Sequence, residues 1–238
     1  AASDVYKRQT WNVTMRPTRT TSTGWVMHQD SARHVAMSSD GMIQVVVGEA
    51  MSMPSGTASS TRYTGGIYVS SDFGVTWNET MFTIYPTTNG PGYEWQGIAM
   101  SSDGLIQTAV DKNGYIWTSS DAGATWTSRA SSQSWYGVAM SSDGTIQTAG
   151  VNGGNLWTST DSGVTWTEVT SIDSTQSWYN VGMSADGTVQ TAVAYGGNIW
   201  MSYDSGTSWA EASISGSYNW YDVAMNANGT IQAATILS

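Results

Sequence analysis

The chain of 238 residues contains no cysteine, and this absence excludes several kinds of chemistry. Without thiols there is no disulfide, no thiolate nucleophile and no zinc site built on thiolates. The lack of cysteine does not select a compartment, and an extracellular location stays open. Long apolar runs are also missing, because no stretch approaches the roughly 20 residues that a membrane-spanning helix needs. We therefore expect no membrane insertion.

Basic residues are scarce as well: eight Lys and Arg stand against 18 Asp and Glu, and the formal net charge is −10. Five of the eight lie among the first 33 residues: Lys7, Arg8, Arg16, Arg19 and Arg33. A phosphate backbone or an anionic membrane would be repelled by most of such a chain. We therefore expect neither nucleic acid nor membrane as a partner.

The aromatic residues are unevenly distributed, with 2 Phe against 13 Trp and 12 Tyr. Tyr and Trp join a large ring to a polar group, so they suit positions that are half packed and half hydrated. The chain also has 26 Gly, and 39% of its residues are hydrophobic. This composition is too apolar for disorder and fits many short strands joined by tight turns.

A first phrase, Ala-Met-Ser-Ser-Asp-Gly in its most complete form, recurs five times along the chain. Its copies lie at residues 36–41, 99–104, 139–144, 182–187 and 224–229. Each copy is followed by a glutamine, and these are Gln44, Gln107, Gln147, Gln190 and Gln232. We expect the glutamines to form hydrogen bonds between neighbouring sheets rather than to contact a ligand.

A second phrase, Ser-x-Asp-x-Gly-x-Thr-Trp, follows the first in four copies, the fourth with Ser208 in place of threonine. The aspartates of this phrase are Asp72, Asp121, Asp161 and Asp204, which recur every 40 to 49 residues. Repeats of this length with four short strands each are typical of propeller blades. We expect these aspartates to stabilise turns rather than to bind metal or catalyse a reaction.

The third copy illustrates the four strands that we expect in each repeat. Turn residues divide it into strands at 135–140, 145–150, 155–159 and 164–169, called A to D in chain order. The Asp-Gly and Gly-Gly pairs between them supply the positive φ that tight hairpins need. Strand A is apolar on both faces, as expected for a sheet packed between two neighbours.

These strands predict a single all-β domain, a five-bladed β-propeller of four-stranded antiparallel blades. The blades would span about 32–82, 94–130, 134–170 and 177–212, and the fifth would combine 219–238 with 1–14. The N-terminal segment would supply strands C and D of this last blade, because Thr10-Trp11 matches the end of the second phrase. Pairing of the two chain ends would close the ring and hide its sheet edges. A fragment of a longer propeller is the alternative.

The second phrase resembles the Asp-box, or bacterial neuraminidase repeat, of the sialidase-like propellers. In that family the box forms the turn between the outer two strands of a blade. The family includes sialidases, xyloglucan-cleaving glycosidases, sortilin-type receptors and photosystem II assembly factors, so the resemblance implies a fold without an activity. A sialidase-like site would need an arginine triad, but the chain has six arginines, four of them before residue 34. We therefore expect no catalytic residue, no metal and no cofactor.

The propeller also predicts where a ligand would bind. The Asp-Gly turns, A–B and C–D, would share one face, while the variable B–C turns and D–A connections would share the other. Loops on a rigid scaffold usually carry function. The B–C turns contribute amide and aromatic side chains: Asn113, Tyr115, Asn152, Asn155, Tyr195 and Asn198. We therefore expect the site on the second face.

Strand A begins with an aromatic pair or with Trp-Gln in four copies, whereas the first copy has Ala32-Arg33 followed by His34 and a long insertion at 49–64. Flat rings beside amide groups are what sugar rings need. The candidate ligand-binding residues are Trp95, Trp135, Tyr136, Trp178, Tyr179, Trp220, Tyr221 and Arg33. The alternative role for the tryptophans is packing between blades.

The sequence thus favours a non-enzymatic binding propeller whose ligand is a carbohydrate or glycoconjugate. One alternative is a protein-binding scaffold similar to the photosystem II assembly factors. The other is a relative of the glycoside hydrolases, which would need two carboxylates in a cleft. No pair of acidic residues outside the repeated turns is distinguished by its spacing.

Overall fold

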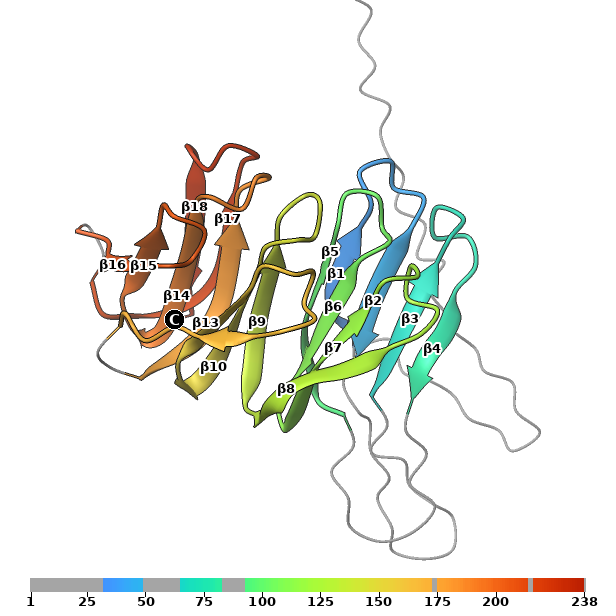
Figure 1. Ribbon diagram of the computed structural model, residues 1–238, viewed down its shortest axis with the longest axis horizontal. Helices are drawn as coiled ribbons and strands as arrows, with labels where there is room; N and C mark the ends of the chain where they lie inside the picture. The colour runs from blue at the N-terminus through green and yellow to red at the C-terminus, as the bar shows by residue number, and fades with distance from the viewer. Residues whose placement is uncertain (1–31, 49–64, 83–92, 173–174, 214–215, 238) are drawn as a thin grey trace, which may run out of the picture.

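The computed structural model describes residues 32–48, 65–82, 93–172, 175–213 and 216–237. These residues form antiparallel strands and no helix (Figure 1), so none of the described segments is a helix able to cross a membrane. The sheets lie side by side in chain order, as the blades of a propeller do. The all-β prediction is therefore confirmed.

Four sheets each contain four strands. The first consists of β1 (Ala32–Met37), β2 (Gln44–Gly48), β3 (Gly66–Ser70) and β4 (Asn78–Phe82). The second consists of β5 (Trp95–Met100), β6 (Gln107–Asp111), β7 (Gly114–Ser119) and β8 (Thr127–Gln133). The third consists of β9 (Trp135–Met140), β10 (Gln147–Gly154), β11 (Leu156–Ser159) and β12 (Thr167–Glu168). The fourth consists of β13 (Gln176–Met183), β14 (Gln190–Gly197), β15 (Ile199–Ser202) and β16 (Ala210–Glu211).

A fifth pair of strands, β17 (Tyr218–Met225) and β18 (Gln232–Ile236), follows the fourth sheet. Short ladders join the last three units, because β10 also pairs with β13 and β14 also pairs with β17. The predicted contribution of residues 1–14 to this fifth unit lies outside the described residues.

The strand positions predicted for the third copy agree well with the structure at its inner strand. β9 spans the predicted residues, whereas β10 continues to Gly154 through the predicted B–C turn. The outer strand is reduced to two residues, Thr167 and Glu168. The extension of β10 has a clear cause, since its last residues pair with β13 of the next sheet.

The Asp-box turns have the structural role predicted for them. In the second copy Asp121 accepts hydrogen bonds from the Ser119 hydroxyl at 2.7 Å and from the Thr125 amide at 2.8 Å. Gly123 has a φ of +81° and Ala122, before it, a φ of +57°, so both central residues are left-handed. This is the type I′ geometry that fits the twist of a hairpin. The box tryptophan closes the turn, since Trp126 Nε1 donates to the Gly123 carbonyl at 3.0 Å.

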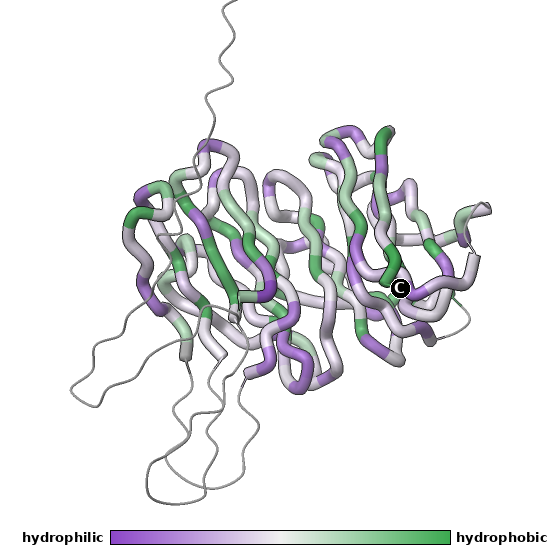
Figure 2. The backbone as a smooth tube through the Cα atoms, turned by 180° about the vertical axis from the view of Figure 1, so that it is seen from behind, coloured by the Kyte–Doolittle hydropathy of each residue, from purple (hydrophilic) through white to green (hydrophobic). Residues whose placement is uncertain are grey.

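The hydrophobic core is divided into layers between neighbouring sheets. The first layer packs Val45, Val47 and Ile67 of the first sheet against Trp95 and Ile98 of the second. The next two layers contain Trp135 and Trp178 in the corresponding places. Figure 2 shows the result as hydrophobic stretches along the strands and hydrophilic stretches in many of the turns. Face-to-face packing of sheets therefore stabilises the fold.

Three of the five strand B glutamines connect neighbouring sheets, as predicted. Gln147 Oε1 accepts a hydrogen bond of 2.7 Å from Thr108 of the preceding sheet, and its Nε2 donates to the Gly144 carbonyl at 2.9 Å. The same arrangement recurs at Gln190 and Gln232. Gln147 and Gln190 are fully buried, so neither contacts a ligand.

Candidate functional site

Each of the five inner strands, β1, β5, β9, β13 and β17, is interrupted near its start by a β-bulge. In β13, Trp178 pairs with Ala194 and Asn180 with Val193, so Tyr179 has no residue opposite it. The register shifts at the equivalent place in the other four inner strands. The residues at this position, which we call the bulge residues, are Arg33, Gln96, Tyr136, Tyr179 and Tyr221. A bulge redirects a side chain, and bulges are enriched at barrel rims and beside active sites.

Three of the bulge residues form a continuous aromatic cluster. The ring of Tyr179 lies 5.0 Å from that of Tyr136 and 4.9 Å from that of Tyr221, measured between centroids. Tyr195, at the B–C end of β14, adds a fourth ring 5.8 Å from Tyr179. Desolvation by these neighbours raises the pKa of Tyr179. Tyr221 and Tyr195 keep 41% and 45% of their surface exposed, so the cluster offers rings to solvent.

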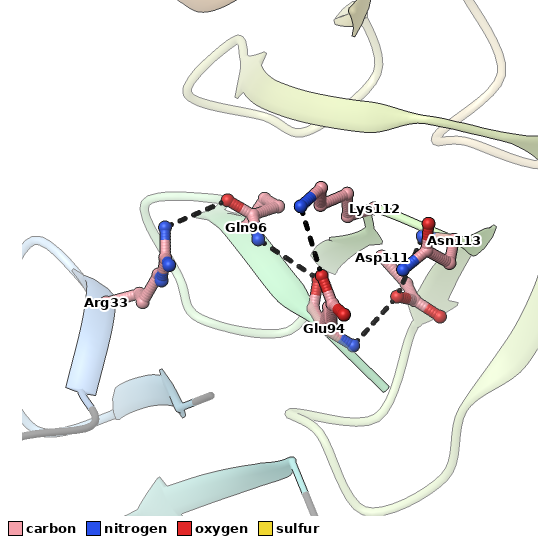
Figure 3. Close-up of polar contacts among 6 residues, drawn as sticks. All are labelled: Arg33, Glu94, Gln96, Asp111, Lys112 and Asn113. Atoms are coloured by element: carbon pink, nitrogen blue, oxygen red, sulfur yellow. Dashed lines mark hydrogen bonds and ion pairs between the residues drawn. The ribbon is translucent and has the colours of Figure 1, made fainter. Parts of the chain in front are cut away.

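The first two sheets contribute a polar cluster (Figure 3). Arg33 Nη1 donates to Gln96 Oε1 at 3.1 Å across the boundary between the first and second sheets. Lys112 Nζ lies 3.3 Å from Glu94 Oε2 in a half-exposed ion pair. The Tyr136 phenol in its ionised form is the first cause of the raised pKa of Lys112, so this ammonium lies near the Tyr136 ring. The bulge residues together with Glu94, Lys112 and Tyr195 are called the rim below.

Asp111 connects the polar cluster to the neighbouring backbone. Its Oδ1 accepts hydrogen bonds from the Glu94 amide at 2.9 Å and from the Asn113 amide at 3.3 Å (Figure 3). Burial raises the pKa of Asp111, and the two amide donors act against that effect. The carboxylate therefore holds the B–C turn of the second sheet against the start of β5.

A second polar layer lies one residue further along the inner strands. Asn180 Nδ2 donates to Asp222 Oδ1 at 2.5 Å, which joins β13 to β17. Much of the His34 side chain is accessible, yet neighbouring atoms desolvate its imidazole and lower its pKa, against the opposing charge of Asp222. Among the described residues no three His, Asp or Glu side chains are grouped as metal ligands.

The prediction that Trp95, Trp135 and Trp178 form platforms for a ligand is wrong. Trp95, Trp135 and Trp178 are fully buried, so no ligand can stack on their indoles. Trp135 and Trp178 instead make edge-to-face contacts with Trp157 and Trp200, at 5.9 and 6.3 Å. The bulge explains the difference, because it leaves the tryptophan turned between the sheets and directs the following residue towards the rim. Trp220 is partly buried, and its Nε1 donates to the Gly216 carbonyl at 3.1 Å.

The structure therefore brings together the predicted residues Arg33, Tyr136, Tyr179 and Tyr221. Gln96, Glu94 and Lys112 join them but were absent from the predicted site, and so was Tyr195, although its turn was expected nearby. The sequence does carry a signal for two of them. Gln96 occupies the same repeat position as the predicted tyrosines, and Tyr195 lies in a B–C turn that was expected on the same face. Nothing in the sequence signals the Glu94–Lys112 ion pair.

Sequence comparison identifies a BNR-Asp box repeat at residues 67–80, which include most of β3, the following turn and the start of β4. No curated protein sequence matches the chain. The chain is similar in fold to YCF48 bound to D1 peptide, at 14% identity and a TM-score of 0.55, over 82% of this chain and 57% of that one.

Two further solved structures are similar in fold. One is the GH74 xyloglucanase of Xanthomonas campestris, with 17% identity, a TM-score of 0.58 and coverage of 82% of this chain and 33% of the enzyme. The other is the β-propeller domain of Cps50 (Swd1) from Myceliophteria thermophila, with 10% identity, a TM-score of 0.61 and coverage of 88% and 63%. The chain spans less than two thirds of each of these three chains, and at such identities the likeness concerns the fold alone. The chain therefore has a β-propeller fold and carries a BNR-Asp box repeat at residues 67–80.

Proposed function

We propose that this protein is a non-enzymatic binding propeller that takes a carbohydrate or glycoconjugate at the rim. The observation that carries the proposal is the bulge repeated in all five inner strands. A bulge costs one ladder position in each strand, and here it directs five side chains to one place. The varied chemistry of these side chains contrasts with the Asp-Gly pattern that recurs in the turns on the opposite face.

The composition of the rim supports a sugar ligand. The exposed rings of Tyr221 and Tyr195 offer apolar faces to the C–H groups of a sugar, and the tyrosine hydroxyls offer hydrogen bonds. The ion pair of Lys112 with Glu94 adds donors and acceptors for sugar hydroxyls, whereas Gln96 is buried and holds Arg33 in place. Aromatic rings beside a small number of polar groups are the usual composition of such sites.

A glycan array tests the proposal directly. We expect the wild-type chain to bind at least one class of glycan, and Tyr221→Ala to weaken that binding at least tenfold through loss of an exposed ring. Tyr203→Ala is the matched control, because Tyr203 is 69% exposed on the Asp-box side of the molecule. Absence of binding to every glycan, or equal loss in both variants, would reject the sugar hypothesis.

A peptide is the second candidate ligand. YCF48, whose fold is similar, was solved with a D1 peptide bound. The polar cluster around Arg33 and Lys112 suits the carboxylates and backbone of a peptide as well as the hydroxyls of a sugar. A peptide array screened beside the glycan array separates the two, with Tyr221→Ala again expected to weaken whichever class binds.

A hydrolytic activity is the third candidate, because GH74 enzymes are among the similar folds. Glu94 of the rim and its neighbour Asp111 already have structural partners: Glu94 pairs with Lys112, and Asp111 accepts from two backbone amides. The test is an assay of xyloglucan hydrolysis. Activity in the wild type that is lost in Glu94→Gln would establish hydrolysis rather than binding alone.

We also propose that the propeller has five blades and that the fifth packs against the first, with residues 1–14 supplying its outer strands. Backbone hydrogen bonds of 2.7 Å run from blade to blade through the A–B turns, at the pairs 39–102, 102–142, 142–185 and 185–227. Among the described residues this series ends at Ala227. Contact of Ala227 with Ser39 would complete it.

The apolar contacts between these turns suggest the same closure. A Cβ at Gly104 would lie 2.7 Å from Ile43, and one at Gly229 would lie 2.7 Å from Val189. Gly41 has no such neighbour within 4 Å, and Ile231 at the other end is 70% exposed. In a closed ring, Ile231 would pack against Gly41 as Ile43 packs against Gly104.

Cysteine pairs test the closure in a chain that has no natural cysteine. Under mild oxidation we expect Ser39→Cys with Ala227→Cys to form an intramolecular disulfide, as the known neighbours Ser39→Cys with Ser102→Cys should. Ser39→Cys with Ser142→Cys, two blades apart, is the negative control. Cross-linking of the first pair only between molecules would contradict a closed five-bladed ring.

A further inference from the structure

The turn face, opposite the rim, carries an apolar patch on the first two blades. Its members are Met42, Phe73, Val75 and Leu105, which are 40%, 64%, 75% and 48% exposed. The equivalent turn positions in the fourth blade are polar: Thr188 matches Met42 and Leu105, Ser205 matches Phe73, and Thr207 matches Val75. The repeat therefore does not require large apolar side chains here.

Hydrogen bonds place these four residues in adjoining turns. The Phe73 amide donates to the Met42 carbonyl at 3.1 Å, so the two turns of the first blade touch. The Ser39 amide donates to the Ser102 carbonyl at 2.7 Å, which joins the A–B turns of the first and second blades. Figure 1 shows the β1–β2, β3–β4 and β5–β6 turns at the same edge of the molecule.

Carboxylates surround the apolar side chains. Asp40 Oδ1 accepts from the Met42 amide at 2.9 Å, and Asp103 Oδ1 accepts from the Leu105 amide at 3.0 Å. Asp72 adjoins Phe73 in the Asp-box. Hydroxyl and amide donors lower the pKa of all three carboxyl groups, the Ser38 hydroxyl for Asp40, the Thr76 hydroxyl for Asp72 and the Ser101 hydroxyl for Asp103. They are therefore ionised at neutral pH.

We propose that this patch, made of Met42, Phe73, Val75 and Leu105 within a border of Asp40, Asp72 and Asp103, docks a cationic amphipathic segment of a partner protein. Exposed apolar side chains with a polar border are typical of protein interaction sites. The three fixed negative charges, on a chain of net charge −10, favour a segment with Lys or Arg beside its apolar residues. The same charge disfavours a second copy of this chain and an anionic membrane.

The test uses the full chain and two synthetic 18-residue peptides of equal charge. In the first, Leu and Lys are arranged to give an amphipathic helix, and in the second every Leu is replaced by Gln. Fluorescence anisotropy should show binding of the Leu-Lys peptide at micromolar concentration, weakened by added salt. It should show at least tenfold weaker binding of the Gln-Lys peptide.

Substitution to the residues of the other blades provides the matched variants. Phe73→Ser with Leu105→Thr should weaken binding of the Leu-Lys peptide at least tenfold, and circular dichroism should report an unchanged fold. The control Val164→Thr changes an isolated side chain of the same face that is 50% exposed. Tyr221→Ala, at the rim, should leave binding of the Leu-Lys peptide to the turn face unchanged, so failure of the rim proposal does not affect this one.

Three outcomes would overturn the proposal. They are no binding of the Leu-Lys peptide, equal binding of both peptides, and equal binding by the wild type and the Phe73→Ser, Leu105→Thr variant. Self-association of the wild type that this variant abolishes, measured by sedimentation velocity, would also overturn it by assigning the patch to a second copy.

Discussion

Thr148 on β10 donates a hydrogen bond of 2.7 Å to Gln190 on β14 and thereby joins two neighbouring blades. Both side chains are fully buried. Gln190 also donates from Nε2 to the Gly187 carbonyl at 3.1 Å, so one glutamine fixes a turn in its own blade and a strand in the preceding one. Equivalent pairs, Thr108 with Gln147 and Thr191 with Gln232, recur at two other junctions.

Thr148→Val should destabilise the protein by about 1–3 kcal/mol. Valine keeps the shape of threonine but leaves Gln190 Oε1 buried without its donor. Urea unfolding followed by fluorescence measures the change. Thr160→Val, at an exposed turn position, is the control, and it should change the free energy of unfolding by less than about 0.5 kcal/mol. Equal effects of the two substitutions would show that the inter-blade hydrogen bond contributes nothing.

The first junction lacks this hydrogen bond. Val45 occupies the place of the threonine, and Gln107 Oε1 is buried with no hydrogen-bond partner. Val45→Thr should therefore stabilise the protein by about 0.5–1.5 kcal/mol. Val47→Thr, a buried change within the same apolar layer, should be destabilising. A loss of stability in Val45→Thr as large as that in Val47→Thr would contradict the assigned pairing.

Ser205→Asn should stabilise the fourth Asp-box. Ser205 has a φ of +60° and precedes Gly206, whose φ is +81°. Asn-Gly is the preferred pair for a type I′ turn, because asparagine tolerates the left-handed conformation. We expect a gain of about 0.5–1 kcal/mol in the free energy of unfolding. Thr207→Asn, outside the positive-φ pair, should give no gain, and a gain of equal size there would refute the explanation.

Acid should destabilise the protein through its turn aspartates. The Ser184 hydroxyl, with the amide and hydroxyl of Thr188, lowers the pKa of Asp186 to about 2. A carboxyl whose pKa is lower in the folded state stabilises the fold above its unfolded pKa, which is about 4. This stabilisation is lost as the pH falls from about 4 towards 2.

Asn228, the equivalent residue of the fifth copy, provides a pair of opposite variants. Asp186→Asn should make the loss of stability between pH 4 and 2 shallower, whereas Asn228→Asp should make it steeper. Urea unfolding at pH 2 to 6 measures both slopes. If neither substitution alters the slope, the turn carboxylates do not govern acid unfolding.

The repeated turns and the glutamines could be predicted from sequence because their interactions are local or repeat with the blade. The Asp121 carboxylate accepts its hydrogen bonds from Ser119 and Thr125, which lie within four positions of it. The hydrogen bonds of the glutamines between sheets could be predicted because a polar residue recurs at one position of an otherwise apolar strand. Such features depend little on how the sheets are finally arranged.

The assignment of Trp178 and Tyr179 could not be made in the same way. A regular strand alternates its side chains between two faces, but the bulge shifts this alternation at the rim. No residue type in the sequence marks the bulge, since the bulged position holds Arg, Gln or Tyr. The sequence therefore predicted the tryptophans together with the tyrosines as platforms, whereas the structure buries Trp95, Trp135 and Trp178.

The most direct test follows the tyrosine ring and tryptophan indole signals by NMR during titration with the glycan that binds most strongly on the array. The bulge geometry predicts large shifts for Tyr136, Tyr179 and Tyr221. It predicts unchanged indole N–H signals for Trp95, Trp135 and Trp178. Shifts confined to these indoles, with the three tyrosines unmoved, would contradict it.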